Sequence, residues 1–324
     1  MRASSVCKKR NRLARSYQLM SEYTSLMGGF VSAEKKPTRY EYCSKWFEYQ
    51  FLDHYFAAVP PWRCFVRKFS GLRTLPDFCV VGPIKGGTSD LAVNIMLHPH
   101  IMPPLAKEYY SSDIDKLRIL YPTEKQRNNH ALVNGGVMCP FLAPYLNWME
   151  FVHNFSIAKP NAKIVLTLRD PVDRLYSHWK WEVFQSGKER VEGLPFLSTF
   201  SAYVDKALSL FPEYPMYTVC RSEPLQTSIY WKAVSFWIEC FGRENVLVLD
   251  IESYFLDKSR FLNEIYDFVG LPQFHIPSGG DRVNENPIEL SPPDQESLLK
   301  LTAFFESHNQ KLWGLLGKEF NWSK

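Results

Sequence analysis

The sequence predicts an α/β fold in which a mostly parallel sheet is covered by helices on both faces. Three short runs are apolar throughout, which is typical of strands buried on both sides. Helix-like segments alternate with these runs, and a glycine-rich turn joins the first run to the helix that follows it. This order favours a P-loop-type sheet in one domain that begins near residue 76.

The individual elements follow from local patterns along the chain. Apolar runs bounded by polar residues or glycine predict buried strands, and proline at a first helical position marks one helix start. The predicted strands lie within 77–82, 161–169 and 245–250, and the predicted helices span 88–97, 171–185, 225–241, 259–269 and 293–306. The region Ser186–Pro224 is longer and reads as less regular, so we expect it to be an insertion on the substrate side.

The N-terminal part has a different composition. Residues 1–40 are polar without sustained periodicity, and residues 8–15 carry five basic side chains, which is typical of a flexible, solvated arm. A membrane-surface contact or a targeting role is the alternative for this arm. Residues 41–75 are rich in aromatic residues and are expected to form a lead-in packed on the domain that follows.

Composition narrows the class of protein. The 324 residues are 45% hydrophobic, 15% aromatic and 22% charged, which suits one large globular domain or two small ones. A net charge of +4 does not predict nucleic-acid binding, but it allows a basic groove for an anionic ligand. No apolar run reaches the ~18–20 residues of a membrane span, and no signal peptide is visible. We expect a soluble chain or the catalytic domain of a longer anchored protein.

Cysteines and glycosylation sequons add little. Seven scattered cysteines show no metal-ligand spacing, so a zinc site is not expected. Two Asn-x-Ser triplets, at Asn154 and Asn321, would be glycosylated only in the secretory pathway. The oligomeric state cannot be inferred from these features.

The sharpest motif is the turn between the first predicted strand and its helix. It places Lys85, Gly86, Gly87, Thr88 and Ser89 where backbone N–H groups and a helix N-terminus can wrap an anion. An ordinary strand-to-helix turn uses glycines too, but it needs neither the lysine nor the two hydroxyls. The lysine precedes the glycine pair, whereas a Walker A loop ends in Gly-Lys-Ser/Thr. A magnesium-dependent kinase or NTPase is therefore disfavoured.

This turn resembles the 5′-phosphosulfate loop of sulfotransferases, and the Lys-Gly-Gly-Thr-Ser form followed by Leu91 is most similar to Golgi carbohydrate sulfotransferases of the heparan and chondroitin type. The resemblance runs from about residue 77 to the end, with the 186–224 region weakly matched. It implies a single sulfotransferase domain over residues 76–324. It also implies 3′-phosphoadenosine 5′-phosphosulfate (PAPS) as co-substrate, 3′-phosphoadenosine 5′-phosphate (PAP) as product, and no metal. The implied acceptor is a carbohydrate hydroxyl, and the implied location is the Golgi lumen or secretory pathway, although a cytoplasmic location stays open.

A second anion motif follows the second predicted strand. Arg169 at the strand end and Ser177 two helical turns on are similar to the family's 3′-phosphate motif, and an arginine fork suits phosphate oxygens. Taken alone, Arg169 could equally form a surface salt bridge. Arg174 between them is expected to be a structural ion-pair residue.

Two further nucleotide contacts are candidates. Tyr230 and Trp237 lie one heptad apart on a predicted helix and could line an adenine pocket, although aromatic residues at this spacing usually belong to the core. In related enzymes a basic loop near the position of Arg282 closes over the nucleotide. This chain lacks the Lys-Gly-Arg form of that loop, so Arg282 is its one candidate.

The proposed general base is Glu108. The segment Ala106–Tyr110 is similar to the Lys-Glu-aromatic segment of glycosaminoglycan sulfotransferases, in which the glutamate is the base. Lys107 would contact the sulfo group or the acceptor, or hold Glu108, whereas the plain alternative is a surface Lys-Glu pair. His178 is a rival base that more naturally packs or binds phosphate or substrate. The competing functions are sulfation of a small alcohol or phenol, and a non-catalytic nucleotide-binding protein on the same fold.

Overall fold

A computed structural model describes residues 61–105, 107, 111–134, 136–143, 146–212, 223–276 and 290–322. These residues fall into two compact units. One comprises the described residues within 1–77 and 95–141, and the other comprises those within 78–94 and 142–324. The predicted arm at 1–40 and most of the aromatic lead-in at 41–75 lie outside the described residues.

The second unit is built on a parallel sheet, as predicted. Strands β1 (Phe78–Val81), β3 (Lys163–Leu168) and β4 (Val246–Asp250) pair in parallel, with Val80 opposite Val165 and Leu166 opposite Val248. Strand β2 (Pro140–Ala143), whose first two residues fall within the range of the first unit, completes the order β2-β1-β3-β4. The sequence did not predict β2, because four residues that begin with proline give too short a pattern to recognise.

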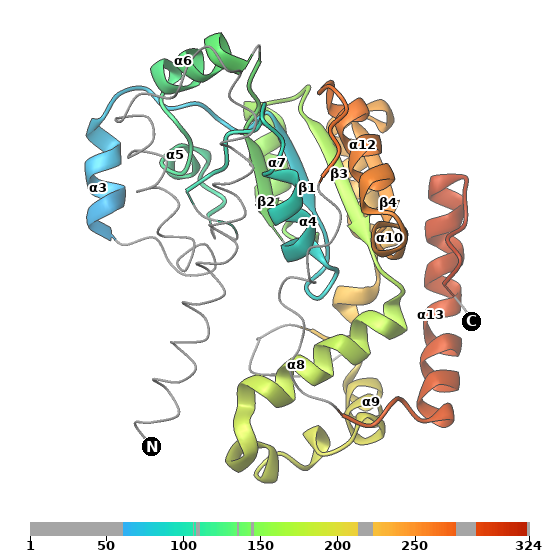
Figure 1. Cartoon of the computed structure of the whole chain (residues 1–324). Helices are drawn as coiled ribbons and strands as arrows, with labels where there is room; N and C mark the ends of the chain where they lie inside the picture. Colours follow the sequence, from blue (N-terminus) through green and yellow to red (C-terminus); the bar gives the residue numbers. More distant parts are fainter. Residues whose placement is uncertain are drawn as a thin grey trace. The chain divides into compact units, whose positions relative to one another are not determined.

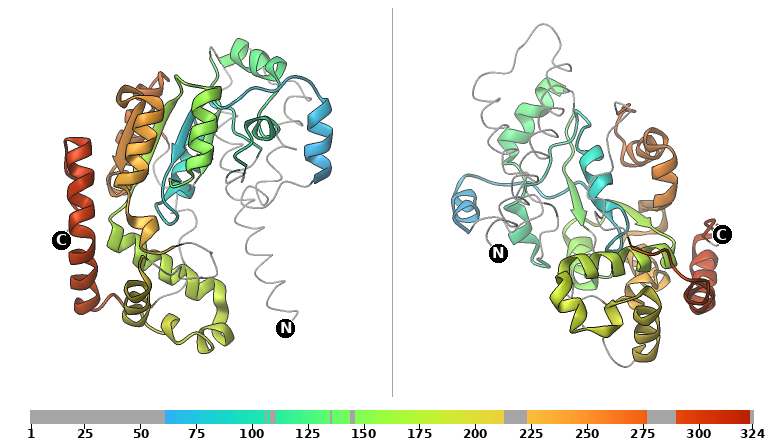
Figure 2. Two further views of the ribbon diagram at one scale, coloured as in Figure 1. Left: turned by 180° about the vertical axis from the view of Figure 1, so that it is seen from behind. Right: turned by 60° about the horizontal axis from the view of Figure 1, so that its bottom comes forward.

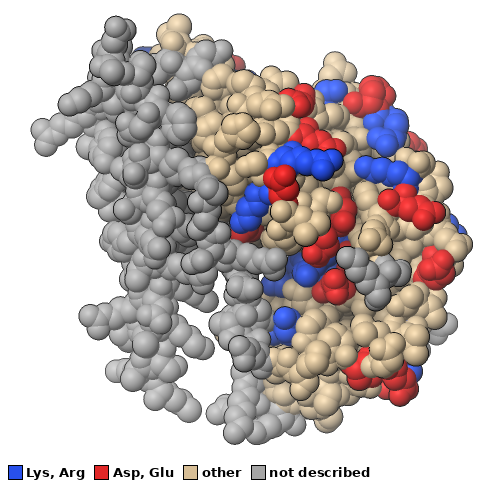
Figure 3. Space-filling model, turned by 45° about the vertical axis from the view of Figure 1, so that its right-hand side comes forward, with Lys and Arg blue, Asp and Glu red and all other residues tan. Residues whose placement is uncertain are grey.

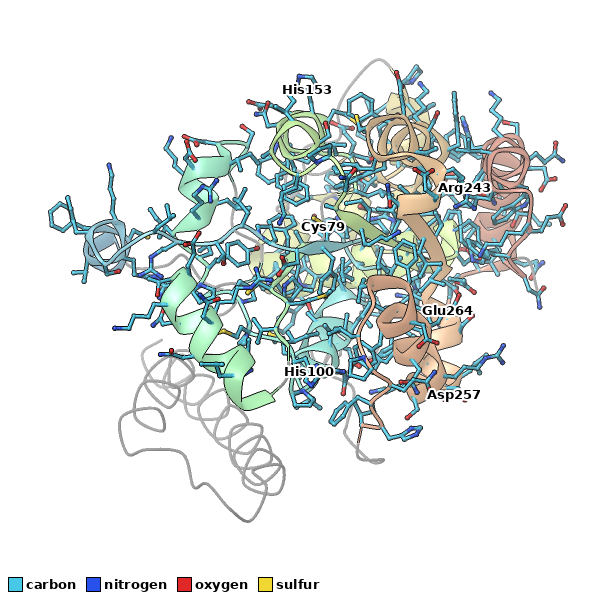
Figure 4. The ribbon with its side chains drawn as sticks, turned by 90° about the horizontal axis from the view of Figure 1, so that it is seen from above. Cys79, His100, His153, Arg243, Asp257 and Glu264 are labelled. Carbon is cyan, nitrogen blue, oxygen red and sulfur yellow. The ribbon has the colours of Figure 1, made fainter. Side chains whose placement is uncertain are left out.

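Helices cover both faces of this sheet (Figure 1, Figure 4). Helices α4 (Thr88–Ile95) and α12 (Lys258–Val269) lie on one face, and α7 (Met149–Ala158) and α10 (Trp231–Phe241) lie on the other. Trp237 of α10 packs against Phe151 of α7, with ring centroids 6.3 Å apart, and its indole N–H donates to the Leu146 carbonyl at 2.9 Å. Trp237 therefore belongs to the core.

Cys79 lies within the sheet, and burial raises the pKa of its thiol.

Further helices gather at the end of the sheet where the parallel strands finish (Figure 2). They are α8 (Pro171–Glu192), the short 3-10 turn at Pro195–Leu197 and α9 (Phe200–Leu210), and α13 (Gln295–Leu316) packs against both α9 and α10. Trp179, Tyr203 and Phe305 are buried in the core that these helices share. The expectation of irregular structure over 186–224 is wrong for its described part, because α8 continues to Glu192 and α9 follows.

Several helix boundaries differ from the predicted ones. Helix α10 begins at Trp231, because a 3-10 turn at Gln226–Ser228 precedes it. Helix α13 begins at Gln295, where Asp294 caps it, and continues to Leu316, where Gly317 ends it with a left-handed φ of 67°. A helix that the sequence did not predict, α11 (Ile251–Leu256), follows β4 directly.

The first unit contains α3 (Pro61–Phe69), α5 (Ile114–Arg118) and α6 (Glu124–Asn134). Arginines hold it together. Arg67 donates to the carbonyls of Ile119 and Tyr121 at 2.6 and 2.9 Å, and buried Arg73 also donates to Tyr121 at 2.7 Å. Arg127 pairs with Asp77 at 3.0 Å. Lys107 is buried within this unit, with 2% of its surface exposed.

The charged surface is mixed. On the face drawn in Figure 3, basic and acidic residues are interspersed, which matches the small net charge. Within the described ranges, no helix is long and apolar enough to cross a membrane, and no group of three or more histidines, cysteines or carboxylates is placed to hold a metal ion.

Candidate active site

The glycine-rich turn lies between β1 and α4, as predicted, and the packing around it explains its glycines. The N–H of Gly86 donates to the Pro83 carbonyl at 2.9 Å, and a Cβ on Gly86 would lie only 2.8 Å from that same oxygen. Gly87 has φ +75°, and a Cβ there would lie 2.9 Å from Ile251 of α11. Both positions therefore exclude larger residues, and the turn keeps its backbone close to the helix N-terminus.

Lys85 occupies the unusual position in this turn. Its φ is 66°, a left-handed conformation that costs a non-glycine residue about 1–2 kcal/mol. Its carbonyl accepts a hydrogen bond from Arg169 at 3.2 Å, and its ammonium lies 5.7 Å from the ring centroid of Trp181 on α8. Neighbouring elements thus hold a strained backbone, which is a recurrent property of functional sites.

The first turn of α4 supplies the hydroxyls. Thr88 is buried and Ser89 is half-buried at the start of the helix. Asp90, directly after them, is buried and bonded to Tyr254, Asn94 and Lys258, with the Lys258 ammonium 3.0 Å from its carboxylate. Lys258 thereby offsets a negative charge that would otherwise oppose an anion at this helix N-terminus.

Arg169 lies at the junction of β3 and α8. Its Nε donates to the Glu252 carboxylate at 3.0 Å, and its Nη1 donates to Lys85 as described above. Arg169 therefore forms the salt bridge that the sequence offered as its alternative role, and it also contacts the glycine-rich turn. Because the same guanidinium touches both junctions, an anion bound at either one would sense it.

Asp170 and Ser177 complete the second junction. Asp170 caps α8 by accepting the N–H groups of Val172 and Asp173, and Pro171 is the first helical residue. Burial, followed by the charge of Asp173, raises the pKa of Asp170 to about 6. Ser177 is half-buried on α8. A carboxyl that gains a proton near pH 6 makes this junction less repulsive toward phosphate in mildly acidic solution.

Arg174 cross-links the site from within. It is fully buried, and it donates to the Ser228 hydroxyl at 2.6 Å, to the Ile84 carbonyl at 3.4 Å and to the Pro224 carbonyl. These acceptors belong to the glycine-rich turn and to the segment before α10. Arg174 thus holds two loops against α8, which is a structural role.

His178 lies on α8 and has no exposed surface. Its Nδ1 is 2.9 Å from the Tyr203 hydroxyl, and its Nε2 is 3.7 Å from the Glu182 carboxylate. Burial lowers its pKa well below the ordinary value, and the charges of Arg174 and Lys85 lower it further. A neutral, enclosed imidazole is suited to holding α8 and α9 together and is badly placed to meet an acceptor.

Tyr230 precedes α10 and is almost fully buried. Its ring packs on Trp322, with centroids 5.8 Å apart, and Trp322 donates its indole N–H to Asp250 at 3.1 Å. The Tyr230 hydroxyl has no well-formed hydrogen bond within the described part of the chain. This buried hydroxyl senses the charges of Arg174 and Arg169, and it could still form a hydrogen bond with a ligand.

The roles of three predicted residues stay predictions. Glu108 and Arg282 lie outside the described residues, and Lys107 is buried within the other compact unit. Conversely, the sequence reasoning missed Glu252, Trp181 and Tyr203. Glu252 could have been suspected from its place two residues after a strand end, but the other two carry no local signal.

The fold has a counterpart among solved structures. A sulfotransferase from Alicyclobacillus acidocaldarius matches with a TM-score of 0.55 and 22% identity, over 76% of this chain and 98% of that one. At this identity the likeness concerns the fold alone.

Curated relatives are distant. The membrane-associated sulfotransferase kil1 of Dictyostelium discoideum is 24% identical over 78% of this chain and 67% of its own length. Human heparan sulfate glucosamine 3-O-sulfotransferase 3A1 is 22% identical over 82% of this chain and 67% of its own. Human carbohydrate sulfotransferase 15 is 24% identical over 62% of this chain, which spans only 44% of that relative.

The sulfotransferase domain model matches residues 75–278, more than half of the 324-residue chain. The matched range contains both strand–helix junctions and all four strands of the sheet, β1 to β4. This chain belongs to the sulfotransferase family and is a sulfotransferase enzyme.

Proposed function

We propose that this enzyme transfers the sulfo group of PAPS to a hydroxyl of a carbohydrate acceptor. The observation that carries the proposal is the hydrogen bond from Arg169 to the Lys85 carbonyl, because it joins two anion-suited junctions at one edge of the sheet. A nucleotide with phosphates at both its 5′ and 3′ positions would use both junctions at once.

The donor would be divided between the two junctions. The 5′-phosphosulfate would lie on Gly86, Gly87, Thr88 and Ser89, where helix N–H groups and hydroxyls suit an anion. The 3′-phosphate would meet Arg169 and Ser177. Tyr230 would contact the nucleoside, and Arg282 would close over it. None of these contacts requires a metal.

The reaction balances without a further reactant. A bond forms between the acceptor oxygen and sulfur, while the bond from sulfur to the bridging phosphate oxygen breaks and leaves its electron pair on PAP. Lys85 would stabilise the negative charge that develops on that phosphate. Glu108 would take the proton of the acceptor hydroxyl. Alignment and electrostatics would supply most of the acceleration.

The acceptor class is supported by the relatives, whose names include carbohydrate and heparan sulfate sulfotransferases. Lys107 would hold Glu108, because its buried side chain leaves almost no surface for an acceptor. His178 would support the site by holding α8 and α9 together, because its enclosed ring cannot meet an acceptor directly. A secretory-pathway location, such as the Golgi lumen, fits an acceptor of this class.

One labelling experiment tests this proposal. The protein is incubated with PAPS that carries a labelled sulfo group, together with a panel of acidic and neutral glycans, a simple alcohol and phenols. We expect label on a glycan and none on the small acceptors. Label only on a phenol or alcohol would overturn the carbohydrate assignment. Label on nothing, with PAP still bound, would favour a non-catalytic nucleotide-binding protein.

A further inference from the structure

A second group of ligand-type side chains lies on α10 and α13, outside the two junctions. It consists of Trp231 and Lys232 at the start of α10, and His308 and Lys311 one turn apart on α13. We call these four residues the α10–α13 cluster. The two lysines are exposed, and the two rings are half-buried.

The two lysines share one aromatic ring. The Lys232 ammonium lies 5.6 Å from the Trp231 ring centroid, and the Lys311 ammonium lies 5.2 Å from it. The two charges are therefore separated by no more than the sum of these distances. Contacts of an ammonium with an indole are attractive, but they leave both positive charges in place.

Within the part of the chain that the structure describes, no carboxylate forms an ion pair with Lys232 or Lys311. His308 senses them: burial lowers its pKa, and the charges of Lys311 and Lys232 lower it further. Lys300 of α13, by contrast, is neutralised by Asp205 and Glu296, each at 2.8 Å. The cluster is thus a local centre of positive potential.

The cluster also holds unused hydrogen-bonding groups beside aromatic faces. The indole Nε1 of Trp231 and the Nδ1 of His308 are buried, and neither has a hydrogen-bond partner among the described residues. Phe304 packs on His308, with centroids 5.6 Å apart. The aromatic rings and the exposed ammonium groups together match a sugar that carries sulfate or carboxylate groups.

We propose that the α10–α13 cluster is a binding site, separate from the reaction centre, for an acidic polysaccharide chain that carries sulfate or carboxylate groups. This proposal deepens the proposed function and rests on it. The polysaccharide bound here would be the acceptor or the product, held at sugars distant from the hydroxyl that reacts. Lys232 and Lys311 would contact its anionic groups, and the rings would contact its sugar faces.

The position of the cluster supports this occupant. Trp231 directly follows Tyr230, so the cluster adjoins the nucleotide side of the site along the chain. Two helices contribute the cluster, and on the face drawn in Figure 3 basic side chains are interspersed with acidic ones and form no continuous basic surface. A narrow cluster of two lysines suits one flexible acidic chain better than the phosphate backbone of a nucleic acid, which needs many contacts.

The test compares matched double variants of the full chain. Lys232→Ala with Lys311→Ala removes both charges of the cluster, whereas Lys125→Ala with Lys206→Ala removes two exposed charges elsewhere. Binding of a size-defined heparin hexasaccharide is measured by calorimetry, with an uncharged oligosaccharide of equal length and a DNA oligonucleotide as comparison ligands. Because the cluster variant loses two exposed ionic contacts, its dissociation constant for the hexasaccharide should be roughly tenfold larger than that of the natural chain. The dissociation constant of the control variant should change less than about twofold.

Further readouts separate this site from the nucleotide site. The dissociation constant of PAP should be unchanged in the cluster variant, so failure of PAP binding in every form would concern the proposed function alone. Bound hexasaccharide should raise the pKa of His308, followed by NMR, because it neutralises the lysine charges. Equal hexasaccharide binding in both double variants would overturn the proposal. Equal binding of the uncharged oligosaccharide, or of DNA, would also overturn it.

Discussion

The two strand–helix junctions of the site are both suited to an anion, but one uses mainly backbone groups and the other mainly side chains. The β1–α4 junction is built from backbone, with glycines at 86 and 87 and a left-handed Lys85. The β3–α8 junction is built from side chains, with Arg169 held by Glu252 and Asp170 capping the helix. A backbone site is fixed by its own sequence, whereas a side-chain site depends on partners far along the chain.

The largest expected effect concerns the chemical step, and it should leave nucleotide binding by the two junctions unchanged. If Glu108 is the base, Glu108→Gln keeps the size of the side chain and removes its basicity. Turnover should fall roughly 10²–10⁴-fold, while the PAP dissociation constant stays unchanged. Steady-state kinetics and calorimetry on the same preparation check this. Near-normal turnover would show that the base lies elsewhere.

Lys85 allows the backbone and side-chain contributions of the first junction to be separated. Lys85→Ala and Lys85→Gly both remove the ammonium, so turnover should fall about 10²–10³-fold in each. Glycine accepts the left-handed φ without strain, so the Gly variant should be about 1 kcal/mol more stable than the Ala variant. Urea unfolding measures this difference. Equal stability would mean that the turn has no stored strain at this residue.

Arg169 tests whether the second junction is a true binding element. Arg169→Ala should weaken PAP binding by about 1.5–3 kcal/mol, since it removes a charge-assisted contact. Glu252→Gln is the matched change on its partner. It frees the guanidinium from the salt bridge seen at 3.0 Å, so PAP affinity should stay the same or improve. A parallel loss in both variants would instead assign Arg169 to the architecture of the loop.

The smallest effect concerns the cap of α8. Asp170 has a pKa near 6 in the folded protein, above its ordinary value, because burial disfavours the carboxylate. The native state therefore binds this proton more tightly than the unfolded chain, and its stabilising effect is lost as pH rises from about 4 to 6. Asp170→Asn keeps the cap without the charge, and should gain about 1–2 kcal/mol of stability relative to the natural chain at pH 7 but little at pH 4.

Urea unfolding of both proteins at these two pH values checks this expectation. A stability difference that does not change with pH would contradict it.

These two junctions also show what the sequence could predict. The glycine-rich turn was recognisable because its strand, glycines, lysine and hydroxyls are consecutive. Strands β1, β3 and β4 of the sheet were predictable because they are apolar almost throughout, whereas β2 was too short to recognise. Glu252 was not predictable as the partner of Arg169, because 83 residues separate them. The burial of His178 depends likewise on Tyr203 of α9, in a region whose helices the sequence did not indicate.

Helix ends were harder to predict than helices. Residues 225–230 continue the apolar pattern of α10, yet Ser228 turns inward to bond Arg174, and a 3-10 turn results. Tyr230 consequently lies before the helix. The roles of Glu108 and Arg282 stay predictions, since both residues lie outside the described part of the chain.

The central claim is that the two junctions together bind a nucleotide with phosphates at its 5′ and 3′ positions, without a metal. Calorimetry of the natural chain with PAP, in EDTA, tests it most directly. We expect one PAP per chain and an affinity that EDTA does not change, with much weaker binding of adenosine 5′-phosphate, which lacks the 3′-phosphate. Preference for ATP with magnesium over PAP, or equal binding of adenosine 5′-phosphate, would contradict the account.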